Sequence, residues 1–226
     1  MSAFLIAVAS IVWQKVSYGF FYRQCKEKVN EEIRHAKTIK AIDNMFKAFY
    51  YSAICVWGYL ILKDEYFIPP MMLGTGDLQL LESKFPFYEG PYGLKYYYLG
   101  TMGYHWYSMV LHIFKKARND YVEMILHHGG TVFLYGVSYY LNRIECGLVI
   151  MYLHDWADIF TGIARSLSET NFKKTTIISF VGLLVSWAYT RLYVYPFVWK
   201  KVLTVEIYNG KYPIVANSQG AFLIAL

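Results

Sequence analysis

The chain has 226 residues, of which 56% are hydrophobic and only 17% charged, below the roughly 25% that soluble domains carry. The formal net charge of +6 would suit a nucleic-acid-binding protein, but the basic residues lie between apolar stretches rather than along one exposed face. These features exclude an ordinary soluble domain and argue against nucleic acid as a partner. The cysteines Cys25, Cys55 and Cys146 lack the spacing of a metal site or a disulfide framework, so we expect buried thiols.

Six apolar stretches are each about as long as the hydrocarbon core of a membrane is thick, roughly 20 residues of helix. They predict an all-α, polytopic integral membrane protein with six to seven transmembrane helices. In chain order, the predicted spans are residues 3–22, 44–62, 96–114, 121–141, 147–164 and 176–199. Residues 221–226 look like the start of a seventh span, which we expect to be incomplete. The first span lacks a basic n-region, so no cleavable signal peptide is expected.

Basic residues predict the orientation of these spans. Thirteen Lys and Arg lie in residues 23–47 and in the loops on the same side, against seven on the opposite side. Because cytosolic loops are enriched in Lys and Arg, residues 23–47 should face the cytosol or an equivalent matrix-like compartment. Within this segment, Lys26–Lys40 mixes lysines with glutamates, which indicates either a surface helix on anionic headgroups or a solvated linker.

The remaining segments set the domain organisation. We expect residues 1–43 to form an N-terminal transmembrane helix with a basic cytosolic segment, and residues 44–226 to form one membrane domain. Residues 63–95 contain four prolines and four glycines. Such a composition breaks regular helix, so this segment is predicted to be a structured aromatic cap or a re-entrant loop rather than a span.

The fourth predicted span carries ionisable side chains, which cost about 2.5–3.5 kcal/mol each in hydrocarbon. Glu123, His127 and Thr131 follow one another at four-residue intervals, so they should form one polar stripe on the helix. His128 lies about 100° around the helix from His127 and can still face an internal cavity. Ionisable residues inside a span indicate a functional site.

The fifth span adds His154, Asp155 and Asp158, of which His154 and Asp158 share a helical face. At 1.5 Å of rise per residue, His128 should lie roughly 11 Å and His154 roughly 15 Å from the cytosolic ends of their spans. The short connection 142–146 joins the two spans, so they should be antiparallel neighbours. The histidines and carboxylates are therefore predicted to converge in one layer of the membrane.

Three kinds of site fit these residues. The first is a hydrogen-bonded cluster that only holds helices together. The second is a metal site, because histidine and aspartate are suitable ligands, although the adjacent His127 and His128 point in different directions. The third is an acid–base or nucleophilic centre in a dry cavity, where a histidine deprotonates an attacking amine or carries an acyl group itself. We favour the third interpretation and expect no metal.

The polar residues of the fourth and fifth spans, with their neighbours, resemble a known motif. They are His127, His128, Thr131, Leu134, Ser138, Tyr139, Asn142, Gly147, His154, Asp155 and Asp158. Their order and spacing are similar to the Lag1 motif, which marks ceramide synthases within the TLC domain superfamily. The likeness covers about residues 40–226 and extends to Asp120, Glu123, Tyr96–Tyr98, Trp106, Arg191, Pro196 and Phe197.

This resemblance implies a ceramide-synthase-like sphingoid-base N-acyltransferase that uses fatty acyl-CoA as substrate and needs no cofactor. It implies that His127 and His128 form the acyl-transfer pair. His154 and Asp155 would complete the catalytic centre, with Asp158 as an orienting carboxylate. The partners would be lipid substrates, and the protein would act as a homodimer or a subunit of a membrane complex. The expected location is the endoplasmic reticulum membrane, with the mitochondrial inner membrane as the alternative.

Several positions depart from the motif. Glu145 stands where the family usually has arginine, Thr161-Gly162 where it has Leu-Glu, and Gly129-Gly130 where it has two bulky apolar residues. These departures keep open an alternative from another class, a non-catalytic TLC-domain protein that binds lipid or serves as an accessory subunit of a membrane complex. The intact histidine and aspartate set favours the enzyme, and the altered flank favours the subunit.

Overall fold

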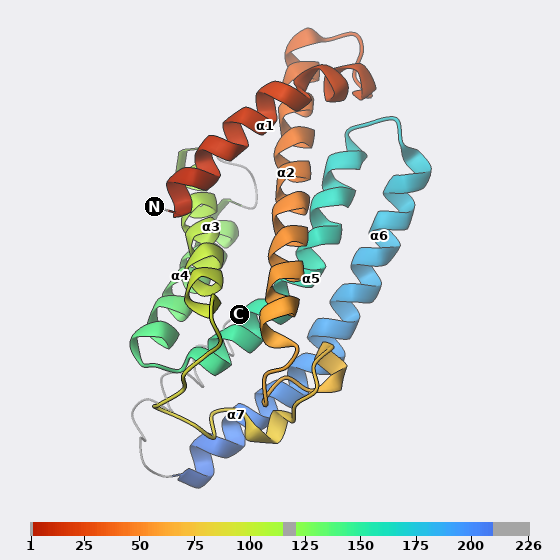
Figure 1. The fold of residues 1–226 in the computed structure, drawn as a ribbon. Helices are drawn as coiled ribbons and strands as arrows, with labels where there is room; N and C mark the ends of the chain where they lie inside the picture. The colour runs from red at the N-terminus through yellow and green to blue at the C-terminus, as the bar shows by residue number, and fades with distance from the viewer. Residues whose placement is uncertain (1, 115–120, 210–226) are drawn as a thin grey trace. The chain divides into compact units, whose positions relative to one another are not determined.

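The computed structural model describes residues 2–114 and 121–209, and within these ranges it is helical with no β-strand (Figure 1). The all-α prediction is confirmed. The long helices are α1 (Ser2–Gln24), α2 (Glu31–Leu62), α3 (Leu94–Phe114), α4 (Tyr121–Tyr140), α5 (Ile144–Ser168), α6 (Lys173–Trp187) and α7 (Tyr195–Asn209). A π-helical segment, η3 (Ala188–Val194), joins α6 to α7, and the short 3-10 helices are η1 (Pro70–Met72) and η2 (Leu78–Leu80).

Three helical stretches in the described part of the chain are long and apolar enough to cross a membrane. They are Ala3–Gln24, Glu31–Leu62 and Lys173–Val202. These stretches support an integral membrane protein, and the other predicted spans form the helices α3, α4 and α5. The count of six or seven spans stays a prediction. The predicted seventh-span fragment, residues 221–226, lies outside the described residues.

The chain divides into two compact units, each described by itself. The first contains the residues up to Gly58 together with Tyr152–Leu192, and the second contains Tyr59–Met151 and the chain from Tyr193. The first unit therefore holds α1, most of α2, the later part of α5, and α6. The second holds the 63–95 loop, α3, α4, the first turns of α5, and α7.

In the first unit, small residues allow α5 to approach α2 closely. A Cβ atom at Gly162 would lie 2.8 Å from both the backbone oxygen of Asn44 and the backbone nitrogen of Ala48. One turn later, the buried Ser166 hydroxyl donates a hydrogen bond of 2.7 Å to the backbone oxygen of Ala41. Small side chains four residues apart are the usual means of close helix packing in membranes. Gly162, which departs from the Lag1 motif, is thus explained by helix packing.

Replacing Gly162 with leucine should lower the free energy of unfolding by about 1–3 kcal/mol, because the added side chain overpacks this contact. Thermal unfolding of purified protein in detergent measures the change. Gly19→Ala is the matched control, since a Cβ atom at Gly19 has nothing within 4 Å. Equal melting temperatures for the two variants would contradict the close α2–α5 contact.

The beginning of α2 is set by a side-chain cap. The Oδ1 atom of Asn30 accepts a hydrogen bond of 3.0 Å from the backbone N–H of Ile33, and Glu31 and Glu32 place negative charge in the first turn. Both features stabilise a helix N-terminus. Residues 31–40 are therefore the first turns of one continuous helix that ends at Leu62. Residues 31–40 are thus helical rather than a solvated linker, and contact of this helical start with anionic headgroups stays a prediction.

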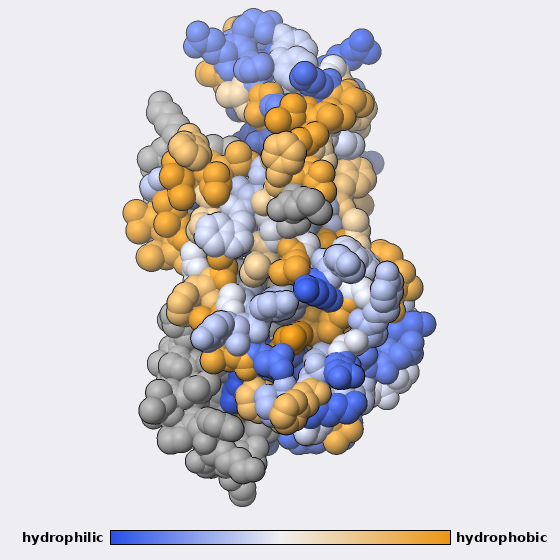
Figure 2. Space-filling model, turned by 60° about the vertical axis from the view of Figure 1, so that its left-hand side comes forward, coloured by the Kyte–Doolittle hydropathy of each residue, from blue (hydrophilic) through white to orange (hydrophobic). Residues whose placement is uncertain are grey.

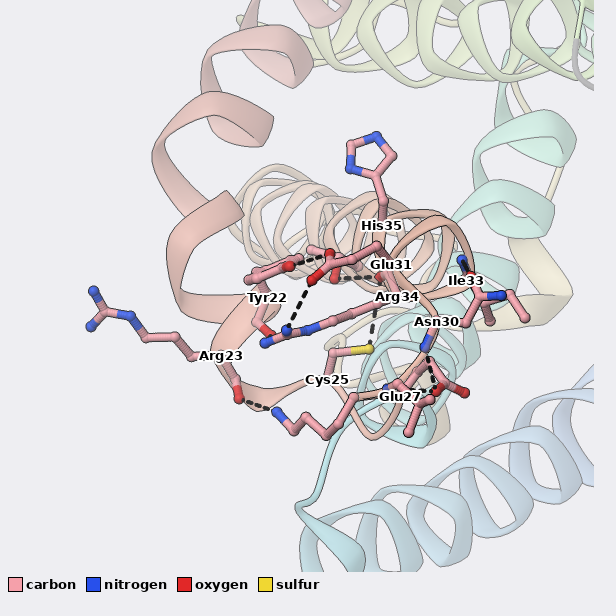
Figure 3. Close-up of polar contacts among 12 residues, drawn as sticks. Tyr22, Arg23, Cys25, Glu27, Asn30, Glu31, Ile33, Arg34 and His35 are labelled. Carbon is pink, nitrogen blue, oxygen red and sulfur yellow. Dashed lines mark hydrogen bonds and ion pairs between the residues drawn. The ribbon is translucent and has the colours of Figure 1, made fainter.

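The elbow, which is the connection between α1 and α2, is held by polar contacts among neighbouring residues (Figure 3). It is also bonded to the α5–α6 connection. The Arg34 guanidinium lies 3.7 Å above the centre of the Tyr22 ring, and its Nη2 donates to the Tyr22 backbone oxygen at 3.0 Å. Cys25 forms an isolated antiparallel β-bridge with Thr170. These contacts attach α1 firmly to the first unit, whereas the predicted domain boundary at residue 43 stays a prediction.

Hydrophilic side chains gather at the end of the molecule where α1 turns into α2, and hydrophobic surface lies directly below them (Figure 2). This distribution agrees with an arrangement in which the elbow is exposed to water and the adjoining helices lie in the lipid bilayer. The native cysteines cannot report on the orientation, because Cys25, Cys55 and Cys146 are all buried, and none of them forms a disulfide with another described residue. The expectation of buried thiols is thus confirmed.

Introduced cysteines should report the orientation with little background. Val29 in the elbow is 93% exposed and Tyr92 in the 63–95 loop is 98% exposed. If the excess of basic residues faces the cytosol, a membrane-impermeant maleimide should label Val29→Cys from the cytosolic side only and Tyr92→Cys from the opposite side only. Labelling of Val29→Cys solely from the opposite side would overturn the predicted topology.

In the second unit, the 63–95 loop is folded against the N-terminal turn of α5. This confirms the prediction of a structured loop rather than a span. The carboxylate of Glu145 accepts a hydrogen bond of 2.5 Å from the Tyr66 hydroxyl and one of 2.6 Å from the Glu82 backbone N–H. The Glu82 carboxylate pairs with Arg143 at 3.5 Å. Glu145 is only 2% exposed, so its departure from the motif provides a buried anchor for this loop. We call these four residues the Glu145 clamp.

Candidate functional site

The histidine pair lies on α4 in the second unit. His127 is exposed and His128 is 9% exposed, with 5.7 Å between their ring centroids. The Thr131 hydroxyl donates to the backbone oxygen of His127 at 2.8 Å, as an intrahelical bond. Successive side chains on a helix diverge, so only one imidazole of the pair is buried. The side chain of Glu123 and all of Asp120 lie outside the described residues.

Other motif residues on α4 and α5 shape the turn between these helices. Asn142 has a positive φ of 58° and ends α4 in the left-handed conformation. The Ser138 hydroxyl donates to the backbone oxygen of Arg143 at 2.5 Å. A Cβ atom at Gly147 would lie 2.6 Å from the Ser138 hydroxyl oxygen and 2.8 Å from that of Tyr98. These three motif positions therefore have a structural role in the second unit.

The aspartates lie on α5 in the first unit. Asp155 is 1% exposed, whereas His154 and Asp158 are half-buried. Neither carboxylate oxygen of Asp155 has a hydrogen-bond partner among the described residues. Asp158 and Arg191 are both close enough to interact with it electrostatically. A buried carboxylate that interacts with a second carboxylate and one guanidinium is an unusual arrangement, because buried charges are normally paired and hydrogen-bonded.

Helix α2 carries two side chains on which the charge of Asp155 acts. The charge of Asp155 acts on the hydroxyl of Tyr50 and on the thiol of Cys55. Both side chains come from α2, and Arg191 comes from the segment η3, so groups of both elements interact electrostatically with Asp155. The sequence did not indicate Tyr50 or Cys55 as site residues, because nothing in the spacing of residues on α2 shows which face meets α5.

Arg191 belongs to the π-helical segment η3, and sequence reasoning did not include it in the site. Pro196 explains the irregular helix, because proline lacks an N–H and clashes with the carbonyl four residues before it. A wider π turn just before a proline relieves this clash and is frequent at functional sites. One signal was present in the sequence. An arginine in the middle of an apolar span is costly and calls for a partner.

Among the described residues, no three His, Cys, Asp or Glu side chains gather as a potential metal site. The absence of a resident metal stays a prediction. The His127–His128 pair and the His154–Asp155 pair belong to different compact units. Their convergence in one layer also stays a prediction.

Comparison with known proteins agrees with the motif. A family model described as TLC domain matches residues 40–226. The chain is 28% identical to ASC1-like protein 3 of Oryza sativa subsp. japonica over 83% of this chain and 64% of that protein. It is 30% identical to ceramide synthase hyl-2 of Caenorhabditis elegans, over 73% of this chain and 48% of that protein.

Ceramide synthase LOH2 of Arabidopsis thaliana is 25% identical over 87% of this chain and 64% of its own length. The chain thus spans about half to two thirds of the length of the curated relatives it matches. The family match covers most of the chain and includes both the histidine pair on α4 and the aspartates on α5. The resemblance seen in the motif is confirmed: the chain belongs to the TLC domain family.

Proposed function

We propose that this protein transfers a fatty acyl group from acyl-CoA to the amine of a sphingoid base. The observation that carries the proposal is Asp155, whose buried carboxylate has no hydrogen-bond partner among the described residues. Buried carboxylates are normally paired, and binding a ligand or performing chemistry is one reason for an exception. An imidazolium or an amine is the kind of group that such a carboxylate binds. The relatives' names, ceramide synthase among them, support the same activity.

In the proposed step, the amine nitrogen of the sphingoid base attacks the thioester carbonyl carbon. A C–N bond forms and the C–S bond breaks. The amine loses a proton to a histidine, and this proton then passes to the departing thiolate of CoA. We assign this base to the acyl-transfer pair His127 and His128, and within it to His128, the buried member. A thioester is already activated, so the step needs a base and charge stabilisation, and we expect no metal or cofactor.

His154, Asp155 and Asp158 would complete the centre. A carboxylate that accepts a hydrogen bond from one ring nitrogen of a histidine fixes the tautomer of that histidine and stabilises the imidazolium cation. We assign this role to Asp155, with Asp158 as a second orienting carboxylate. Arg191 would limit the repulsion between the two carboxylates, because it is the positive charge that acts on Asp155.

The alternative, a TLC-domain protein without catalysis, was motivated by the altered flank of the motif. Two of these departures have packing explanations. Glu145 anchors the 63–95 loop through Tyr66 and the Glu82 backbone, and Gly162 allows the α2–α5 contact. Neither position needs to take part in chemistry, so these departures do not count against an enzyme.

The proposal also includes the number of spans, the location and the assembly of the protein. We propose six or seven spans, since α3, α4 and α5 contain 21, 20 and 25 residues and about 20 suffice to cross. We propose the endoplasmic reticulum membrane as the location, with the mitochondrial inner membrane as the alternative. A homodimer or a membrane-complex subunit is the proposed assembly.

Detergent-extracted protein incubated with labelled acyl-CoA and sphinganine should form the N-acyl product. The rate should be unchanged by a metal chelator, because the thioester needs no Lewis acid. Thin-layer or mass-spectrometric detection of the amide measures the product, and protein with Asp155→Asn serves as the blank. Saturable binding of the labelled lipid without product would favour the non-catalytic alternative, and loss of activity in chelator would contradict the metal-free mechanism.

A further inference from the structure

A third histidine lies beside His128, on the neighbouring helix α3. The ring centroids of His112 and His128 are 6.1 Å apart, with 58° between the ring planes. The His112 ring also stacks on the ring of Tyr121, at 5.2 Å and 20°. The Nε2 atom of His112 lies 3.3 Å from the Tyr121 backbone oxygen. His112 is thus held against the first residue of α4 while it contacts the buried imidazole.

The register of α3 against α4 explains why these rings meet. Side chains seven residues apart lie on nearly the same helical face. Seven residues before His112, His105 contacts Tyr135, which lies seven residues after His128, with ring centroids 5.3 Å apart. Seven residues earlier again, the Tyr98 hydroxyl donates to the Tyr135 backbone oxygen at 2.8 Å. The His112–His128 contact therefore belongs to an antiparallel seam that runs along both helices and does not depend on one rotamer.

The contact with Tyr121 also fixes one ring nitrogen. A backbone carbonyl oxygen only accepts hydrogen bonds, so the Nε2 atom of His112 carries the hydrogen. The stacked Tyr121 ring and this bond together set the plane of His112, which in turn limits the rotation of the His128 ring. We propose that His112 is a positioning residue that holds His128 in the orientation required for acyl transfer. This inference rests on the proposed function and names a residue that the Lag1 motif does not include.

Steady-state kinetics of three variants in detergent test this proposal. His112→Ala removes the ring and should lower kcat by up to about 10²-fold with little change in KM, because misplacing a catalytic group by about 1 Å has an effect of this size. His112→Gln keeps an amide N–H that can donate to the Tyr121 carbonyl and should recover part of kcat. Tyr121→Phe keeps both the ring and the carbonyl and should behave as wild type. Wild-type kcat in His112→Ala, or a loss explained by a smaller folded fraction, would overturn the proposal.

A second measurement does not depend on catalysis. Diethyl pyrocarbonate modifies accessible imidazoles, and peptide mass spectrometry separates the rates at His127 and His128. We expect His112→Ala to change the rate at His128 several-fold and leave that at His127 unchanged. If wild-type protein forms no amide but this change is seen, the proposed function fails and the positioning contact stands. If wild-type protein is active and neither kcat nor the His128 rate responds, the positioning role alone fails.

Discussion

Alanine at His128 should lower the rate of amide formation by about 10²–10⁴-fold, and by more if this histidine also carries the acyl group. The side chain is 9% exposed, and its ring centroid lies 6.1 Å from that of His112 and 5.7 Å from that of His127. It is therefore the imidazole of the α4 pair best shielded from solvent, where a base is most effective. Initial rates of product formation, normalised to folded protein from size-exclusion chromatography, measure the effect.

His35→Ala is the matched control for this prediction. His35 is an exposed histidine on α2, and its Nδ1 lies 2.8 Å from the Tyr18 hydroxyl. Its loss should leave the rate close to that of wild type. If His128→Ala instead loses its folded fraction in parallel with its activity, the interpretation of the site as a hydrogen-bonded core cluster is favoured.

Much of the fold could be predicted because a membrane limits what an apolar stretch can do. Hydrocarbon requires backbone hydrogen bonds within one segment, so each long apolar run becomes a helix. The beginning of α2 could not be predicted from hydropathy, since its first turns are polar. It is set by Asn30, a local cap, and by Arg34, which meets Tyr22 only once the elbow has folded.

The candidate site was predictable where residues are close in the sequence and unpredictable where they are not. The pattern of ionisable residues identified Asp155 and His128, because both stand in apolar spans. The partners of Asp155 on η3 and α2 depend on which helix faces meet. The same holds for Gly162, which the motif presents as a departure although its nearest neighbours lie on α2. A single sequence carries no information on such long-range contacts.

Replacing Glu145 with alanine should lower the free energy of unfolding by about 2–5 kcal/mol. The Tyr66 hydroxyl and the Glu82 backbone N–H would lose their acceptor, and both are partly buried. A buried donor without a partner costs about 1–3 kcal/mol. Glu145→Gln keeps one acceptor oxygen, so the loss should be smaller. Glu145→Arg, which restores the residue usual in the Lag1 motif, should be the most destabilising. It adds a buried cation near Arg143, which already pairs with Glu82.

Alkaline unfolding checks the Glu145 clamp independently. Burial, together with the hydrogen bond to Glu145, raises the pKa of the Tyr66 phenol above its usual value of about 10. Above that pH the unfolded chain releases the phenol proton while the folded chain keeps it, so stability falls as the pH rises. Tyr66→Phe should reduce this alkaline slope, whereas Tyr92→Phe, at a 98% exposed position in the same loop, should leave it unchanged. Identical slopes for the two variants, or wild-type stability in Glu145→Ala, would show that the clamp does not hold the 63–95 loop.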